Sequence, residues 1–154
     1  DKPARVFIDV GGVGAGVVDI LHSWGGDYEK LVVPINFGSE PQEPVHYLPD
    51  GTKEPGPRNR RAEMWKRSRD WLDEPGGADI PDLDSLQADA CGPTYGYDAN
   101  QRLLLESKEH MRNRGIRSPD DWDAVALTFA EPVREQKERA KLMPRMGANG
   151  WLGA

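Results

Sequence analysis

Two aspartates, Asp120 and Asp123, stand three residues apart at the start of a predicted helix. Residues with this spacing lie about 60° apart around a helix axis, so the two carboxylates share one side. Carboxylate oxygens are the ligands that hard divalent cations prefer, and such cations can activate water for hydrolysis. The spacing therefore predicts half of a divalent-metal site, which needs a partner carboxylate from elsewhere in the chain.

The same acids also have a structural explanation. Ser118 is a favourable N-cap, and Pro119 suits the first helical position. Acidic residues in a first helical turn interact favourably with the positive end of the helix dipole, which accounts for Asp120 and Asp121. The dipole argument weakens at Asp123, which lies further into the helix.

A third acid, Asp9, lies at or near the carboxyl end of a predicted strand, where α/β folds gather their functional sites. A charge at that place must be desolvated, paired or bound to a metal. If the final helix packs on this sheet, Asp9 can meet Asp120 and Asp123. An alternating strand can instead point Asp9 toward solvent, and the residues alone leave both possibilities open.

The elements that would position these acids begin with a strand–helix–strand unit. Residues 5–10 form a short apolar run typical of a buried strand, residues 11–16 a glycine turn, and residues 17–24 a helix that ends at two glycines. Residues 31–37 predict the next strand, in which Pro34 indicates an edge or a bulge. Such a unit predicts parallel strands and an α/β fold.

The rest of the chain is predicted to alternate between loops and helices. Residues 38–57 are rich in proline, glycine and glutamate and predict a surface loop, whereas residues 58–72 predict a helix. Further expected elements are a short helix capped by Asp82, a hairpin or β-rich excursion at residues 95–106, a helix at residues 107–114, and a final helix from Ser118 to Ala130. Residues 1–133 are expected to form the domain, and residues 134–154 a mobile tail.

Other catalytic chemistries have little support in the sequence. The glycine turn follows a strand, but Val17 stands where a dinucleotide fingerprint has its third glycine, and the lysine of a P-loop is absent. A tight turn that lets the helix pack closely on the sheet explains the glycines. The three histidines lack zinc-ligand spacing, and Cys91 is the only cysteine.

Positive charge is concentrated in one segment of an acidic chain. The 154 residues include 20 basic and 26 acidic ones, a net charge of −6, so no global basic field favours nucleic acid. The predicted helix at residues 58–72 is nevertheless rich in arginine and lysine, a pattern that usually marks a solvated face. If the acids form a nuclease site, four of its residues become candidates for contacts with DNA phosphates: Arg58, Arg60, Arg61 and Arg67.

Length and composition set the broad class. A chain of this length suits one domain with a proper core, and its mean hydropathy of −0.71 leaves generous polar loops. No segment approaches the length of a membrane span, and a single cysteine fits a reducing compartment. The chain starts at Asp1 without methionine and enters a strand almost at once, which suggests a piece of a longer protein.

Several segments, taken in order, resemble the C-terminal nuclease domain of the large terminase subunit of tailed bacteriophages and prophages. The matching pieces are VFIDVGGVGAGVVD at residues 6–19, NFG at 36–38, NRRAEMW at 59–65, LESK at 105–108, RG at 114–115, SPD at 118–120 and DA at 123–124. The resemblance covers most of residues 4–133, and the order and spacing of the pieces make it fairly specific.

The resemblance implies an RNase H-like α/β fold, a mixed sheet flanked by helices, with an acidic cluster that binds two Mg²⁺ or Mn²⁺ ions. In that scheme Asp9 matches the acid that ends an internal strand, and Asp120 and Asp123 match the acids of the last helix. Asp123 is the first choice as main ligand, because capping and the helix dipole already account for Asp120. Asp121 is expected to face solvent.

The implied function is a metal-dependent endonuclease that cuts concatemeric double-stranded DNA during packaging, in the cytoplasm of an infected or lysogenic bacterial host. Its implied partners are DNA, the portal and the small terminase subunit, without a membrane. In the family a first catalytic acid lies on an upstream strand that this sequence does not contain, so the sheet is expected to be incomplete at its N-terminus. The alternative is a non-catalytic docking or DNA-contact module of the packaging motor, in which the acids only cap a helix.

Overall fold

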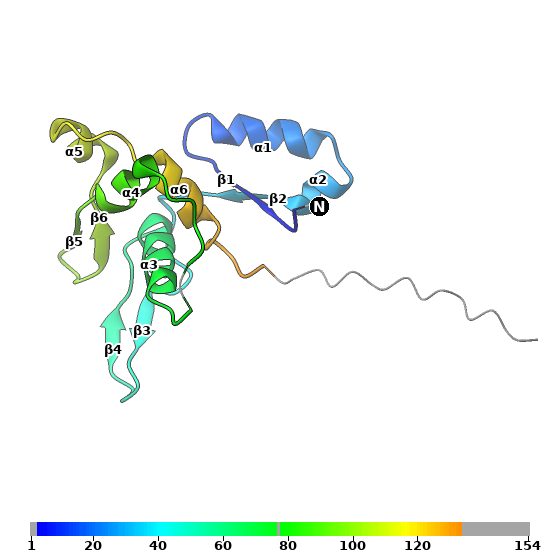
Figure 1. The fold of residues 1–154 in the computed structure, drawn as a ribbon. Coiled ribbons are helices and arrows are strands. Elements are labelled where there is room, and N and C mark those ends of the chain that lie inside the picture. The colour runs from blue at the N-terminus through cyan, green and yellow to red at the C-terminus, as the bar shows by residue number, and fades with distance from the viewer. Residues whose placement is uncertain (1–2, 77, 134–154) are drawn as a thin grey trace, which may run out of the picture.

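The computed structural model describes residues 3–76 and 78–133, and its first unit is the expected strand–helix–strand. β1 (Val6–Asp9) pairs in parallel with β2 (Val32–Ile35). α1 (Gly14–Ser23) and the short α2 (Asp27–Leu31) connect the two strands, and α1 lies alongside them (Figure 1). The parallel α/β unit is confirmed, and α2 is an addition that the sequence pattern did not predict.

The glycine turn between β1 and α1 is needed for close packing. A Cβ atom at Gly14 would collide with the backbone oxygen of Asp9, so only glycine lets α1 start this close to the strand. Gly12 in the same turn has a φ of 73°, a conformation that side chains disfavour. The structural explanation of these glycines is thus confirmed at both positions.

Three helices build the core next to this unit. α3 (Arg60–Leu72) and α4 (Asp84–Cys91) each pack on α6 (Asp120–Leu127), and α6 also contacts β1. α3 begins where predicted to within two residues, because the Asn59 side chain accepts a hydrogen bond from the Ala62 N–H at 3.0 Å. The buried core consists of Ile35, Met64, Trp65, Leu86, Trp122, Ala126 and Ala130. Since Ile35 belongs to β2, the core joins the helices to the parallel strands.

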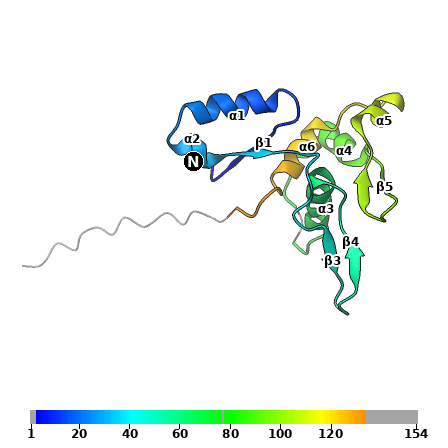
Figure 2. The ribbon, with the colours of Figure 1, turned by 180° about the vertical axis from the view of Figure 1, so that it is seen from behind.

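Two β-hairpins extend from this body. β3 (Val45–Tyr47) and β4 (Lys53–Pro55) form an antiparallel pair that projects beyond α3 in both views (Figures 1 and 2). The prediction of a surface loop at residues 38–57 is therefore wrong for β3 and β4, which are exposed strands. β5 (Tyr95–Tyr97) and β6 (Leu103–Leu105) form the second hairpin, as predicted, and α5 (Lys108–Asn113) follows it.

The fold is mixed α/β, but its strands do not form one sheet in the described residues. They pair as three separate two-stranded sheets, so the expected single mixed sheet flanked by helices is not confirmed for residues 3–76 and 78–133. Within the same ranges, none of the helices has the length and apolar character needed to cross a membrane. The predicted tail at residues 134–154 lies outside the described residues.

Candidate functional site

Asp123 lies on the buried side of α6, where three side chains meet its carboxylate. Its Oδ1 accepts hydrogen bonds from Trp65 Nε1 at 2.7 Å and from Arg61 Nε at 3.1 Å. Its Oδ2 is buried, receives no well-aligned hydrogen bond from the described residues, and lies 2.9 Å from Lys108 Nζ. Because a buried carboxylate must be paired, Arg61 and Lys108 together compensate its charge.

Asp120 occupies the exposed end of the same helix side. Its Oδ1 accepts a hydrogen bond from Ser118 Oγ at 2.6 Å, and Lys108 Nζ donates to the same oxygen at 3.1 Å. The Ser118 contact, followed by that of Lys108, lowers the pKa of Asp120. The expected N-cap role of Ser118 is wrong, since α6 begins at Asp120 without a side-chain cap and the Ser118 hydroxyl donates to Asp120 instead.

The N-terminus of α6 is held from α4 by a residue that sequence reasoning missed. Asp89 Oδ2 accepts a hydrogen bond from the backbone N–H of Asp121 at 2.9 Å, and Asp89 Oδ1 accepts one from Arg117 Nη2 at 2.9 Å. The Asp121 side chain itself is exposed, as predicted. Asp89 precedes Asp121 by 32 residues, so no local pattern could have identified this contact.

Lys108 joins the two carboxylates and is the second residue that the sequence analysis did not single out. Burial would lower the pKa of its ammonium group, but hydrogen bonds and charge from Asp123 and Asp120 raise it overall. The group is therefore a cation that two acids share. One signal was present in the sequence: Lys108 begins a helix, where the dipole disfavours a positive charge unless acids lie nearby.

Asp9 lies at the end of β1, as predicted, next to the glycine turn. Its Oδ1 accepts a hydrogen bond from the backbone N–H of Gly11 at 2.9 Å, and its side chain is half-buried. α6 contacts β1, so the strand end and the acidic helix belong to neighbouring elements. No three acidic, histidine or cysteine side chains gather as a metal-binding group in the described ranges, so Asp9 does not join Asp120 and Asp123 in one cluster there.

The two arginines at the start of α3, Arg60 and Arg61, face the interior rather than solvent. Arg60 donates to Glu63 Oε2 at 2.6 Å and to the backbone oxygen of Ala130 at 2.5 Å, and both charged side chains are buried. Arg61 is also buried, and its Nη1 donates to the Glu106 backbone oxygen at 3.0 Å. The interpretation of this part of α3 as a solvated face is wrong, and buried guanidinium groups are poorly placed to contact DNA phosphates.

Glu63 explains why Arg60 turns inward. Burial would raise the pKa of Glu63, but the backbone N–H groups of Gln42 and Glu43, with Arg60 and Arg67, lower it. Its carboxylate thus anchors the segment that leads into the β3–β4 hairpin. Arg67 pairs with Glu43 and Glu63 at 3.1 Å each, so it too is engaged within the fold.

Arg58 is the one of the four candidate arginines whose side chain is half exposed, at 50%, with Asp98 at 3.7 Å. The expectation of DNA contact therefore stays a prediction for Arg58. The geometry does not support DNA contacts by Arg60 and Arg61, because both side chains are buried and form contacts within the protein.

Solved structures with a similar fold are nuclease domains of a viral large terminase subunit. The chain aligns with a mutant nuclease domain of the large terminase subunit gp2 of bacterial virus Sf6, solved with manganese and beta-thujaplicinol, at a TM-score of 0.64 and 20% identity. It aligns with another structure of the nuclease domain of the same gp2 at a TM-score of 0.63 and 21% identity. In both alignments 84% of this chain is covered and 66% of the other, so the chain spans about two thirds of the solved domains.

No protein-family model and no curated protein sequence matches the chain. The similarity to the Sf6 domains therefore rests on the fold, and it confirms the resemblance to terminase nuclease domains at that level.

Proposed function

We propose that the chain is part of the nuclease domain of a phage or prophage large terminase subunit and cleaves concatemeric double-stranded DNA with divalent metal ions. The observation that carries the proposal is the pairing of Asp120 and Asp123 through one cation, Lys108 Nζ, on a fold shared with terminase nuclease domains. Two carboxylates that share one positive charge have the chemistry of a cation-binding site.

Asp120 and Asp123 would hold Mg²⁺ or Mn²⁺ from α6, and Asp9 would contribute from the end of β1, although the three do not form one group in the described ranges. Carboxylate oxygens are suitable ligands for both ions. The Lys108 ammonium group contacts both α6 acids, at the place where a metal ion would bind. At this site the ions would supply Lewis acidity, which would activate a water and stabilise the leaving oxygen of a phosphodiester. Sf6 gp2 nuclease domains were solved with manganese and with calcium, which fits divalent-metal chemistry in proteins of this fold.

Neighbouring side chains orient the acids of this proposed metal-binding site. Trp65 and Arg61 hold Asp123 Oδ1, which leaves Asp123 Oδ2 for the cation side. Asp120 is open to solvent, so a metal ion can reach it without unfolding α6. Lys108 pairs with both acids, so its ammonium group would have to leave before Asp120 and Asp123 could hold a metal ion.

The remaining parts of the proposal follow from the terminase assignment. The substrate is double-stranded DNA, the partners are the portal and the small terminase subunit, and the place of action is the cytoplasm of the infected or lysogenic bacterial host. The sequence analysis preferred Asp123 as the main metal ligand. Asp120 is now a stronger candidate, because Asp123 already accepts hydrogen bonds from Arg61 and Trp65.

Titration calorimetry with MnCl₂ on the full chain tests the proposed metal-binding site. We expect weak Mn²⁺ binding that disappears in Asp120→Asn combined with Asp9→Asn, while Asp121→Asn, the neighbouring exposed acid, leaves it unchanged. Lys108→Met should tighten binding, because it removes the competing cation. Circular dichroism checks the fold of each variant, and unchanged Mn²⁺ binding in the double variant would overturn the site assignment.

A non-catalytic docking module is the second candidate, and one observation favours it. Among the described residues no group of three metal ligands gathers, and Lys108 already pairs with both Asp120 and Asp123. Such a module would bind DNA or a motor protein without cutting. A plasmid-nicking assay in Mn²⁺ separates the two, because only the nuclease predicts nicking that Asp120→Asn abolishes.

A further inference from the structure

Asp89, on α4, is a buried carboxylate whose side-chain hydrogen bonds in the described part of the chain lead to the start of α6. The residue is 3% exposed. Its Oδ2 accepts from the Asp121 N–H at 2.9 Å, and its Oδ1 accepts from Arg117 Nε at 3.1 Å and from Arg117 Nη2 at 2.9 Å. α4 and α6 lie side by side in both views (Figures 1 and 2). Directed hydrogen bonds of this kind hold one element in a fixed position against another.

α6 depends on this contact because it lacks a cap of its own. The helix begins at Asp120 without a side-chain cap, and the Ser118 hydroxyl donates to the Asp120 carboxylate instead. The first N–H groups of a helix have no partner inside the helix, so an acceptor from elsewhere stabilises them. Asp89 supplies that acceptor, and a carboxylate at this end also interacts favourably with the helix dipole.

The amide that Asp89 holds lies between the two acids of the proposed site. Asp121 stands between Asp120 and Asp123, whose oxygens lie 3.1 Å and 2.9 Å from Lys108 Nζ. Each residue along a helix adds a rotation of about 100° and a rise of about 1.5 Å, so a small turn or slide of α6 would move the carboxylates away from their common cation. The position of the Asp121 N–H therefore sets the geometry of the acid pair.

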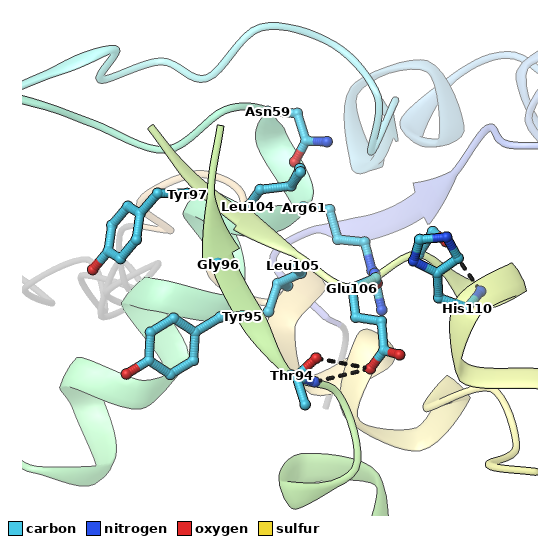
Figure 3. Close-up of a pocket in the computed structure, with 11 residues that line it drawn as sticks. Asn59, Arg61, Thr94, Tyr95, Gly96, Tyr97, Leu104, Leu105, Glu106 and His110 are labelled. Atoms are coloured by element: carbon cyan, nitrogen blue, oxygen red, sulfur yellow. Dashed lines mark hydrogen bonds between the residues drawn. The ribbon is translucent and has the colours of Figure 1, made fainter. Parts of the chain in front are cut away.

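The cations that face the acids are fixed by other elements. Arg61, at the start of α3, donates to Asp123 and to the Glu106 backbone oxygen, and Arg61 and Glu106 line an open pocket of about 470 Å³ beside the β5–β6 hairpin (Figure 3). Lys108 follows shortly after Glu106 in the chain. α6 must therefore be placed against cations that are held independently of it. Apolar packing of α4 on α6 is not directional, and Asp89 supplies the directed contact.

Arg117 compensates the Asp89 charge beside the acids of α6. Its Nη2 lies 2.9 Å from Asp89 Oδ1 and 3.4 Å from Asp121 Oδ2. The Arg117 side chain is 62% exposed, so loss of the Asp89 carboxylate would leave Arg117 in contact with water rather than buried without a partner. Removal of this carboxylate should therefore loosen the start of α6 without unfolding the chain.

We propose that Asp89 is a positioning residue for the proposed metal-binding acids. Its carboxylate fixes the first turn of α6 through the Asp121 amide, so that Asp120 and Asp123 face the same cation. Asp89 acts through the backbone rather than through contact with a metal ion or a substrate. The inference rests on the proposed function for the identity of the cation that replaces the Lys108 ammonium group.

Asp89→Ala and Asp89→Asn test the inference together. The electron paramagnetic resonance signal of free Mn²⁺ measures binding to the full chain, which should weaken about tenfold in Asp89→Ala, as for other residues that orient metal ligands. Asp89→Asn keeps an oxygen that can accept the Asp121 hydrogen bond, so it should recover most of the affinity. Equal weakening in the two variants would overturn the inference, because it would make the charge of Asp89 the cause.

Leu86→Ala is the matched control for stability. Leu86 lies one turn earlier on α4, is 8% exposed and belongs to the core, so its truncation should lower the melting temperature. It should leave the Mn²⁺ affinity at the parent level, at a temperature where both variants are folded, because the hydrogen bond from Asp121 to Asp89 remains. Weakening as large as in Asp89→Ala would overturn the inference by reducing Asp89 to a general stabilising role.

Amide hydrogen exchange, followed by NMR without metal, tests the positioning step by itself. The Asp121 amide should lose its protection in Asp89→Ala and keep it in Asp89→Asn and in Leu86→Ala. Parent-like exchange in Asp89→Ala would overturn the inference whether or not metal binds. Absent Mn²⁺ binding by the parent, together with the expected exchange, would reject the proposed function and keep Asp89 as the residue that positions α6.

Discussion

Apolar side chains lie outside on α1, whereas charged side chains lie inside between α3 and α6. The α1 flank, defined as Val13, Val17, Ile20 and Trp24, has exposed fractions from 45% at Val17 to 89% at Val13. Across the molecule, Arg60 and Asp123 are each 5% exposed and Glu63 is 2% exposed. Hydropathy alone would have placed these two groups the other way round.

The difference follows from the partners that each region has. The spacing of the α1 flank puts its four residues in one stripe, but α1 packs on a two-stranded sheet that covers only the side of Val18. The charges between α3 and α6 can be buried because each carboxylate meets a guanidinium or ammonium group. Burial here reflects available partners more than side-chain polarity.

Glu63→Met is expected to have the largest effect on stability. It leaves the Arg60 guanidinium buried without its carboxylate and removes the acceptor for the Gln42 and Glu43 N–H groups. Breaking a buried pair by removing one partner costs about 3–5 kcal/mol of unfolding free energy. Urea denaturation measures the loss, with Glu54→Met on the exposed β4 strand as the control. Equal stability of the two variants would show that the buried charges are not important for the fold.

The pH dependence of stability tests a further ion pair, Glu106 with the more exposed Arg114. Hydrogen bonds from Arg114 and then from Thr94 lower the pKa of Glu106 to about 2, from an ordinary value of 4.5. Since the folded-state pKa is depressed, the contribution of Glu106 is complete above pH 4.5 and is lost as the pH falls toward 2.

Melting temperatures measured from pH 7 down to pH 3 test this expectation. The parent should lose stability below pH 4.5, where Asp98, Glu63 and Asp120, whose pKa values are also lowered, act in the same direction. Glu106→Gln should reduce the slope in this range, because it removes the titrating group. An identical slope in the variant would argue against a paired Glu106.

The sequence predicted the parallel unit and most of the helices, but it did not predict the β3–β4 hairpin or the contacts between distant segments. The apolar run at β1 and the glycine turn predicted the parallel unit, because strand propensity and close packing are local properties. The β3–β4 hairpin was missed, because its exposed three-residue strands lack an apolar period. The inward turn of Arg60 depends on Glu63 and on Ala130, which lies 70 residues away.

In the candidate site, too, helical spacing could be predicted from the sequence, whereas contacts with distant residues could not. The shared helix side of Asp120 and Asp123 followed from helical spacing, and the common contact with Lys108 confirms it. Lys108 and Asp89 were not predicted as partners, because they lie 12 and 32 residues from the α6 residues that they contact. The structure does not bring Asp9 into one group with the α6 acids in the described ranges, so a metal site shared by the three remains a proposal.

Ile20→Gln on the α1 flank is expected to have the smallest effect. Ile20 is 59% exposed, so the substitution removes little buried apolar area and should change the unfolding free energy by about 0.5 kcal/mol or less. Val18→Gln, two residues earlier at a buried position of the same helix, should cost about 2 kcal/mol or more, because it places an amide among apolar side chains. Urea denaturation of the two variants compares the faces of one helix directly. Equal losses would mean that the flank is covered in solution, and the contrast with the α3–α6 interface would then rest on the buried charges alone.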